Sequence, residues 1–235
     1  MYRKDIPLEE RLILALDVPS VDEARSWVRS LDGIVRFYKV GLQLFLAGHF
    51  SFVDELVESG KKVFLDLKLF DIPNTVAKAM EQINLHGVTF TTVHAESAIL
   101  KAAVEAAPKV GILAVTVLTS MDQEDLKAIG AGASLEDIVI ARASLAARAG
   151  CFGVVASGKE AHAIRRTLGD SLVIVTPGVR PASSSDRGDQ KRVVTPEEAV
   201  KNGADYIVVG RPVLRARDPL GMVEKIMEEL KQSLD

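Results

Sequence analysis

Short apolar runs alternate with amphipathic stretches along the whole chain. Eight of these runs have the length of a buried strand and are bounded by polar or turn-forming residues. We predict strands at 12–18, 35–40, 63–69, 90–94, 111–118, 152–156, 172–175 and 206–209. Helices are predicted at 21–31, 42–59 with a break near Gly48, 73–86, 98–107, 135–149, from about 159, from 196 and from about 219.

Regular alternation of strands and helices requires parallel strands joined by crossover helices. Eight such units predict an α/β fold, a (β/α)8 or TIM barrel, that forms a single domain over residues 1–235. A doubly wound open sheet is the alternative. Residues 1–10 are predicted to be a polar lead-in, and no linker or low-complexity tract divides the chain.

Composition narrows the class of protein. Of the 235 residues, 48% are hydrophobic, which is ample for a large core, and no apolar run reaches the length of a membrane span. The net charge of −3 gives no strong attraction to nucleic acid or to a membrane surface. A single cysteine, Cys151, excludes an internal disulfide and suits a reducing compartment. We therefore expect a cytoplasmic protein with no nucleic-acid or membrane partner.

The third predicted strand carries charges inside an apolar run. Asp66 and Lys68 are two residues apart, so a regular strand places them side by side on one face. Burying charge costs free energy unless it is paired, which suggests that this pair has a chemical role. A purely structural ion pair is the alternative. Asp71 follows just before Pro73, where it could serve the site or cap the next helix.

Polar residues also follow the other predicted strands. The strand ends carry Asp17, Lys39, Asp66, Lys68, His94, Thr119, Ser120, Arg180 and Arg211. Catalytic groups of barrels lie at these carboxyl ends, and the loops after strands seven and eight often hold phosphate. The pattern predicts a phosphorylated substrate with chemistry near the acidic–basic pair. For His94 we expect a structural role, because no second histidine or cysteine stands at metal-ligand spacing.

Simpler roles remain open for several of these side chains. Asp17 could be a turn residue and Lys39 a surface lysine whose alkyl chain covers apolar groups. Arg180 and Arg211 could be ordinary surface charges. The polar, non-periodic segment 178–194 is predicted to be a mobile phosphate-binding loop.

The run from Asp66 to Thr75, DLKLFDIPNT, resembles the signature of the orotidine 5′-monophosphate decarboxylase family of bacterial type. The Asp-x-Lys-x-x-Asp pattern alone is shared by a wider suprafamily. The resemblance extends over essentially the whole chain, through 14–17, 37–41, 118–120, 177–180 and 210–211. Together with Lys39 and the two arginine loops, the pattern is specific.

The resemblance implies cofactor-free decarboxylation of orotidine 5′-monophosphate to UMP and CO2 in de novo pyrimidine biosynthesis, with neither metal nor organic cofactor. It implies that Lys68 protonates C6 of the pyrimidine and that Asp66 lies beside the substrate carboxylate. Lys39 would bond Asp66 and the ribose, and Asp17 the ribose hydroxyls. The family is a homodimer with shared active sites, in which Asp71 would reach the partner's site.

The resemblance also assigns substrate-binding residues beyond the charged array. Ser120 would contact the pyrimidine with Thr119 beside it, and Thr75 belongs to the same signature run. The phosphate would be held by Arg180, Gln190, Gly210 and Arg211.

The chemistry of the reaction fits these residue types. Loss of CO2 leaves negative charge in an in-plane orbital that the ring cannot delocalise, and no cofactor acts as an electron sink. Stabilisation must then come from a fixed cation and an available proton, which an ammonium between carboxylates supplies.

Two other functions remain as alternatives. A Mg²⁺-dependent sugar-phosphate lyase of the same suprafamily would need a glutamate ligand near the second strand end, where this chain has Lys39. A non-catalytic nucleotide-binding barrel would bind through the arginine loops and would need no charged array.

Overall fold

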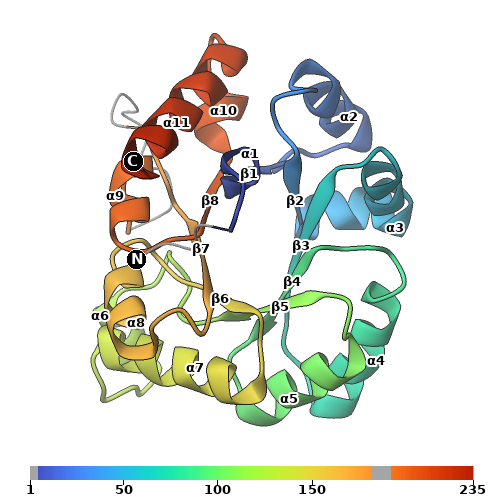
Figure 1. Ribbon diagram of the computed structural model, residues 1–235. Helices are drawn as coiled ribbons and strands as arrows, with labels where there is room; N and C mark the ends of the chain where they lie inside the picture. Colours follow the sequence, from blue (N-terminus) through green and yellow to red (C-terminus); the bar gives the residue numbers. More distant parts are fainter. Residues whose placement is uncertain (1–4, 182–191, 235) are drawn as a thin grey trace.

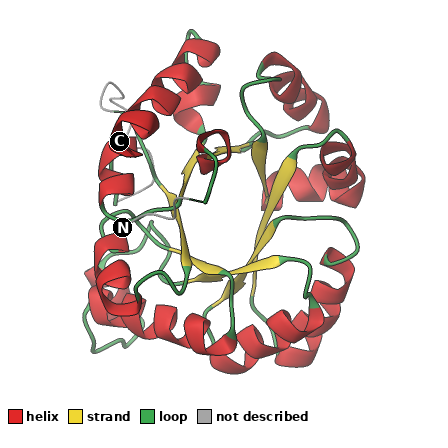
Figure 2. Ribbon diagram, viewed as in Figure 1, coloured by secondary structure: helices red, strands yellow, loops and turns green. Residues whose placement is uncertain are grey.

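The protein forms a closed barrel of eight parallel strands. The computed structural model describes residues 5–181 and 192–234. Each strand pairs with the next in sequence, and β8 closes on β1. Helices surround the barrel on its outside (Figures 1 and 2). The predicted (β/α)8 single-domain fold is confirmed, and the open sheet is excluded.

The elements alternate as the sequence pattern predicts. The strands are β1 (Leu12–Ala15), β2 (Phe37–Gly41), β3 (Lys62–Leu69), β4 (Phe90–His94), β5 (Gly111–Val115), β6 (Gly153–Val155), β7 (Val173–Pro177) and β8 (Tyr206–Val209). The helices are α1 (Leu8–Arg11), α2 (Val21–Ser30), α3 (Leu42–Glu58), α4 (Pro73–Ile83), α5 (Ser97–Ala106), α6 (Gln123–Ala128), α7 (Leu135–Ala149), α8 (Ala161–Leu168), α9 (Pro196–Lys201), α10 (Arg211–Leu214) and α11 (Pro219–Leu234).

Three short helices were not predicted. Residues of α1 fall in the expected polar lead-in, where one helical turn forms directly before β1. The helix α6 begins with a capping box between Asp122 and Asp125, which satisfies its first backbone N–H groups. A proline in the first turn starts α10 immediately after β8. The predicted break in α3 is present and lies at His49, whose φ of 48° is not helical.

Alternation along the strands separates two apolar cores. One set of side chains fills the barrel interior and includes Phe37, Phe64, Phe90 and Tyr206, and the larger set packs between the sheet and the helices. Because inner-face positions recur every second residue, the positions that follow the interior side chains lie at the barrel mouth. Four polar residues occupy such positions: Asp17, Lys39, Asp66 and Thr92.

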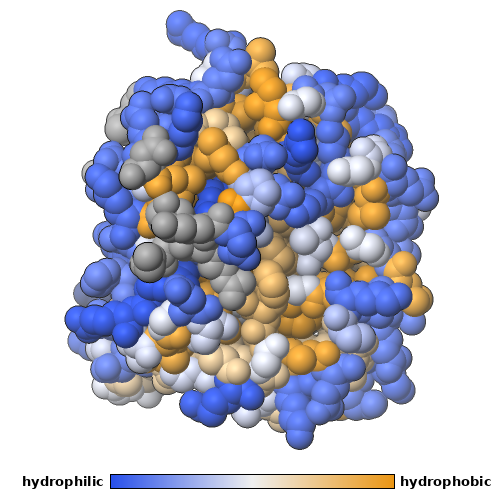
Figure 3. Space-filling view, in the orientation of Figure 1, coloured by the Kyte–Doolittle hydropathy of each residue, from blue (hydrophilic) through white to orange (hydrophobic). Residues whose placement is uncertain are grey.

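The chain before β1 lies at the opposite end of the barrel. Ile6 packs against the interior cluster, and α1 lies at the edge of the barrel beside β1 in Figure 1. The space-filling view of this face shows a mostly hydrophilic outer rim, with hydrophobic residues nearer the middle and between helices (Figure 3). Within the described residues, no helix combines the length and the apolarity needed to cross a bilayer.

A buried arginine ties α8 to the β7–β8 side of the barrel. The Arg165 guanidinium donates to the Gly203 carbonyl at 2.7 Å and to the Asp205 carboxylate at 2.8 Å. The same carboxylate oxygen of Asp205 accepts the backbone N–H of Ile174 at 2.8 Å. Both side chains are almost fully buried, so each charge helps to compensate the other, and Arg165 also lies 3.2 Å from the Asp170 carboxylate.

Removing this arginine is expected to destabilise the fold. Arg165→Ala should lower the free energy of unfolding by about 3 kcal/mol, because it removes the cation that pairs with the buried Asp205 carboxylate at 2.8 Å. That loss corresponds to a fall in Tm of about 6–12 °C for a chain of this size. Arg166→Ala is the matched control, because Arg166 is the next residue of α8 and its side chain is exposed. Its Tm is measured in the same thermal unfolding experiment. Equal Tm values for the two variants would contradict a stabilising role for the buried pair.

Candidate active site

A cavity of about 200 Å³ opens where the carboxyl ends of the strands meet. Its wall is formed by residues from the ends of most of the strands and from the loops that follow them. The structure brings eight of the predicted site residues together in this wall: Asp17, Lys39, Asp66, Lys68, Thr119, Arg180, Gly210 and Arg211.

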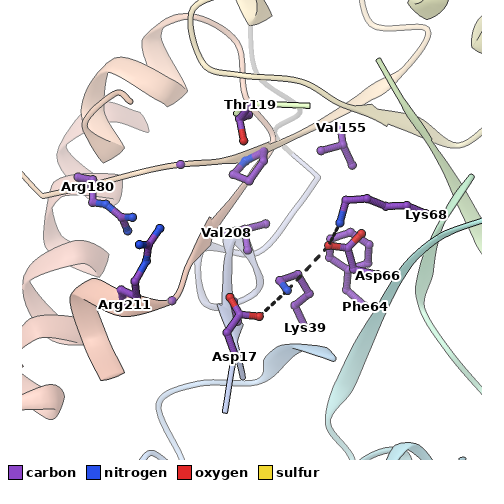
Figure 4. Close-up of a pocket in the computed structure, with 14 residues that line it drawn as sticks. Asp17, Lys39, Phe64, Asp66, Lys68, Thr119, Val155, Arg180, Val208 and Arg211 are labelled. Carbon is purple, nitrogen blue, oxygen red and sulfur yellow. Dashed lines mark hydrogen bonds and ion pairs between the residues drawn. The ribbon is translucent and has the colours of Figure 1, made fainter. Parts of the chain in front are cut away.

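Four side chains form a line of alternating charge across one side of the cavity. The Lys39 Nζ lies 2.9 Å from Asp17 Oδ1 and 3.8 Å from Asp66 Oδ2. The Lys68 Nζ donates to the same Asp66 oxygen at 2.7 Å. Figure 4 shows these contacts as a continuous chain from Asp17 to Lys68. Asp66 is therefore shared by two ammonium groups.

The environment of Asp66 keeps its carboxylate ionised. Only 9% of the residue is exposed, and burial by itself raises the pKa of a carboxyl group. The pKa of Asp66 is nevertheless lowered, because the charges of Lys39 and Lys68 and hydrogen bonds from Lys68 and Thr92 outweigh that burial. The cavity thus holds a fixed anion between two cations at neutral pH.

Lys68 reaches this position through an irregularity in β3. Leu65 pairs with Thr91 and Leu69 with Val93, so β3 covers four residues where β4 covers two. Within this bulge the φ of Lys68 is 50°, a left-handed conformation that is uncommon for a side chain of this type. The regular alternation that we expected for 65–69 is wrong at this point, although the Asp66–Lys68 pair forms.

Two arginines lie on the other side of the cavity. Arg180 faces the space from the loop after β7 and Arg211 from the first position of α10, opposite Lys68 and Asp66 (Figure 4). Gly178, also in the wall, has a φ of 79°, which glycine adopts without strain. The cavity therefore has a cationic end suited to an anion and a separate end with the ion-pair array.

Two glycines make room for the Asp17–Lys39 pair. A Cβ atom on Gly41 would lie 3.1 Å from Lys39 Nζ, and one on Gly210 would lie 3.4 Å from Asp17 Oδ2 and 3.2 Å from the Ala15 Cβ. Larger residues at these positions would crowd the pair, so glycine here serves the packing of the site.

Both ends of the predicted loop 178–194 are fixed in place. Val179 bridges to Val194, and the Arg180 N–H donates to the Val194 carbonyl at 2.9 Å. The Arg192 side chain pairs with Glu160 at 2.7 Å and donates to the carbonyls of residues 117 and 118 at 3.0 and 2.8 Å. Residues 182–191, with the predicted phosphate ligand Gln190, lie outside the described residues.

Several predicted residues do not line the cavity. Thr119 is in the wall, whereas Ser120 is exposed and outside it. Asp71 and Thr75 are exposed on the surface, and one Asp71 oxygen accepts the N–H of the next residue at 2.6 Å. His94 lines a separate hollow, where its ring packs against Phe70.

Several residues of this region were not predicted from the sequence. Phe64, Val155 and Val208 form an apolar part of the wall. Thr92 is fully buried and hydrogen-bonded to both Asp66 and the Lys68 backbone. Only their positions could have indicated these residues, because each one stands on the inward-facing side of its strand, near the end that faces the cavity.

The donor set around Asp66 does not suit a divalent cation. Mg²⁺ prefers an octahedron of oxygen ligands, whereas two ammonium groups approach one oxygen of this carboxylate. Across residues 5–181 and 192–234, no cluster of three histidine, cysteine, aspartate or glutamate side chains could hold a metal ion.

A (β/α)8 barrel with two arginines and a charged array at its mouth is typical of enzymes that act on phosphorylated substrates. The model of the family described as "Orotidine 5'-phosphate decarboxylase / HUMPS family" matches residues 10–226. The chain therefore belongs to this family, and within it to the decarboxylases of pyrimidine nucleotide synthesis.

Individual relatives agree with this assignment over nearly the full chain. Orotidine 5'-phosphate decarboxylase from Methylococcus capsulatus is 47% identical over 232 residues, which cover 98% of this chain and 96% of the relative. The same-named protein of Afipia carboxidovorans is 51% identical over 223 residues, covering 94% of each. A crystal structure of orotidine 5'-phosphate decarboxylase from Lactobacillus acidophilus matches with a TM-score of 0.84 at 33% identity, covering 94% of this chain and 99% of that one.

Proposed function

We propose that the cavity converts orotidine 5′-monophosphate to UMP and CO2, with Lys68 delivering the proton to C6 of the pyrimidine. The observation that carries this proposal is the Lys68–Asp66 contact of 2.7 Å, located across the cavity from Arg180 and Arg211. A nucleotide whose phosphate meets the two arginines directs its base toward the charged array.

The array provides what the reaction needs at its most difficult point. As the C6–CO2 bond breaks, its electron pair stays on C6, and no ring atom delocalises it. The Lys68 ammonium stabilises that charge and then supplies a proton, forming the C6–H bond of UMP. Asp66 keeps the ammonium directed into the cavity and is itself held by Lys39. Lys68 and Asp66 are therefore already paired in the cavity wall.

The ribose is proposed to lie between these two ends. Asp17 and Lys39 stand at the cavity wall between the arginine side and Lys68, where hydroxyl groups of a ribose can hydrogen-bond to both (Figure 4). Thr119 lines the cavity near the expected base position, which favours Thr119 over Ser120 as the contact in this arrangement. Gln190 retains its proposed phosphate role from the family resemblance alone.

We further propose a homodimer in which Asp71 and Thr75 serve the partner's site. Both residues are exposed and outside the wall of their own cavity. Phe70 and Ile72 flank Asp71 and are 69% and 66% exposed, although both are large and apolar. Large exposed apolar side chains around a functional residue favour burial against another subunit.

A cytosolic location is proposed for the enzyme. The one cysteine of the chain, Cys151, is buried and unpaired, and burial raises the pKa of its thiol to about 12. A thiol of that kind is unreactive and compatible with a reducing compartment.

Chelation separates this function from that of a metal-dependent lyase. We expect the purified enzyme to decarboxylate orotidine 5′-monophosphate at an unchanged rate after EDTA treatment, because ammonium groups supply the positive charge. The measurement is the loss of substrate absorbance with and without chelator, with added Mg²⁺ as the control. A rate that falls on chelation and recovers with Mg²⁺ would favour the lyase alternative. Tight binding of UMP without any turnover would favour the non-catalytic barrel.

A further inference from the structure

A buried threonine connects the two central residues of the charged array. Thr92 lies on the inner face of β4, fully buried and opposite the bulge of β3. Its hydroxyl oxygen accepts the backbone N–H of Lys68 at 2.9 Å. The same hydroxyl donates to Asp66 Oδ1 at 2.8 Å. One small side chain thus contacts the backbone of the proton donor and the carboxylate beside it.

The direction of these two hydrogen bonds is fixed by chemistry. A backbone N–H can only donate, so the Thr92 oxygen must be the acceptor toward Lys68. The single hydroxyl proton is then available for Asp66 Oδ1, which must accept it. The other Asp66 oxygen accepts from the Lys68 ammonium. With both oxygens acting as acceptors, this arrangement selects the ionised carboxylate.

The hydroxyl also supports the unusual backbone of Lys68. The bulge removes Lys68 from the regular ladder between β3 and β4, so its N–H needs another acceptor. Thr92 supplies that acceptor where the φ of Lys68 is 50°. The conformation that points the ammonium into the cavity is therefore tied to the group that orients Asp66.

We propose that Thr92 is a positioning residue of the decarboxylase, which sets the direction of the Lys68 side chain and holds Asp66 as an ionised, correctly oriented partner. Thr92 is not part of the cavity wall, so it acts through its two neighbours and not on the substrate. The inference rests on the proposed function of Lys68 as the proton donor.

The charged groups around Asp66 determine how the loss of the Thr92 hydroxyl would change the pH dependence of the enzyme. Lys39 faces it from β2 and Lys68 from its own strand, with Asp17 beyond Lys39 at the end of β1. His94, on the same strand as Thr92, lies near enough to Lys68 to feel its charge. Loss of the Thr92 hydrogen bond leaves these charges in place and removes one stabilising contact to the carboxylate. The pH at which Asp66 protonates should therefore rise.

The test compares Thr92→Val with Thr92→Ser. The valine variant keeps the shape and removes the hydroxyl, and we expect kcat to fall by about 10- to 100-fold, the effect of losing a hydrogen bond to a charged group. KM should change by less than about 3-fold, because the substrate contacts are intact. The acid limb of the kcat profile should move to higher pH. Thr92→Ser retains the hydroxyl and should restore both kcat and the limb.

Thr91→Val is the matched control. Thr91 is equally buried on the adjacent position of β4, and its hydroxyl donates to the Leu65 carbonyl at 2.8 Å, on the same partner strand. Its loss should affect the melting temperature without moving the acid limb. If Thr92→Val does not fold, Thr92→Ala removes the hydroxyl while leaving space for water at the Lys68 N–H. UMP binding confirms that each variant keeps its site.

The outcomes separate this inference from the proposed function. A wild-type enzyme that does not decarboxylate orotidine 5′-monophosphate would overturn the function itself. An active wild-type enzyme with unchanged kcat and acid limb in the hydroxyl-free variants would overturn only the role of Thr92. A fall in kcat that Thr92→Ser does not restore, or that Thr91→Val reproduces, would show that Thr92 serves packing and would also overturn the inference.

Discussion

Lys68→Ala is expected to lower kcat by about 10⁴-fold or more and to leave the barrel folded. In the proposed mechanism the substitution removes both the proton donor and the cation that stabilises the charge on C6, and each effect contributes at least about 100-fold in other enzymes. The site tolerates the change structurally, because the Lys68 side chain is one-third exposed and Asp66 keeps its contact with Lys39. Single-turnover measurements at saturating substrate report the loss in the chemical step.

An exposed lysine of α4 provides the control for this prediction. Lys78→Ala removes the same functional group from the surface and should leave kcat unchanged. UMP binding by Lys68→Ala should persist, since Arg180 and Arg211 remain in the cavity. A Lys68→Ala enzyme that retains a tenth of the wild-type kcat would show that another group protonates C6.

If the enzyme is the proposed dimer with shared sites, mixed dimers of Asp71→Ala and Lys68→Ala subunits are expected to recover activity that neither variant has alone. If Asp71 serves the partner's site, each hybrid dimer contains one site with both residues intact. Random mixing of equal amounts makes about half of the dimers hybrid, so about one quarter of the wild-type sites are restored. The exposed position of Asp71, outside its own cavity, is the structural basis for this expectation. Activity is measured after subunit exchange, with hybrids quantified by differential tags.

A second mixture controls for nonspecific recovery. Asp66→Asn and Lys68→Ala affect residues that lie in contact within one subunit, so every site in their hybrid keeps one defect. This mixture should stay inactive. Verified Asp71→Ala and Lys68→Ala hybrids without activity would place Asp71 in its own subunit's chemistry or outside the chemistry altogether.

The hydrophobic periodicity was sufficient to predict the barrel, because successive side chains of a strand point to opposite faces. Residues such as Phe37 and Lys39 share the inner face through their two-residue spacing, and each apolar run matches a strand. The short helices were harder to predict from the sequence than the strands. The capping box at Asp122 and Asp125 is visible in the sequence, but six residues carry too little hydrophobic periodicity to indicate a helix.

The bulge in β3 could not be predicted from the residue pattern. The spacing of Asp66 and Lys68 suits a regular strand, and nothing in the local sequence requires a φ of 50° at Lys68. That conformation depends on a tertiary contact, the Thr92 hydroxyl of the neighbouring strand. Thr92 itself looked like an ordinary strand residue, because threonine is common in sheets.

The same limit applied to the choice between Thr119 and Ser120. Both follow β5, and their spacing does not reveal which one turns toward the cavity. The structure places Thr119 in the wall, next to carbonyls that the Arg192 side chain holds. The Arg192 side chain and the Leu118 carbonyl are more than seventy residues apart in the sequence. The residue pattern around Thr119 therefore cannot predict this contact.

A crystal structure with bound UMP tests the proton-donor role of Lys68 most directly, through the distance from its Nζ atom to C6 of the pyrimidine. We predict a separation of about 3–3.5 Å, the range for atoms about to react, with Nζ still bonded to Asp66. A bound nucleotide whose C6 faces away from Lys68, or an ammonium turned to bulk water and beyond hydrogen-bond reach of Asp66, would contradict it.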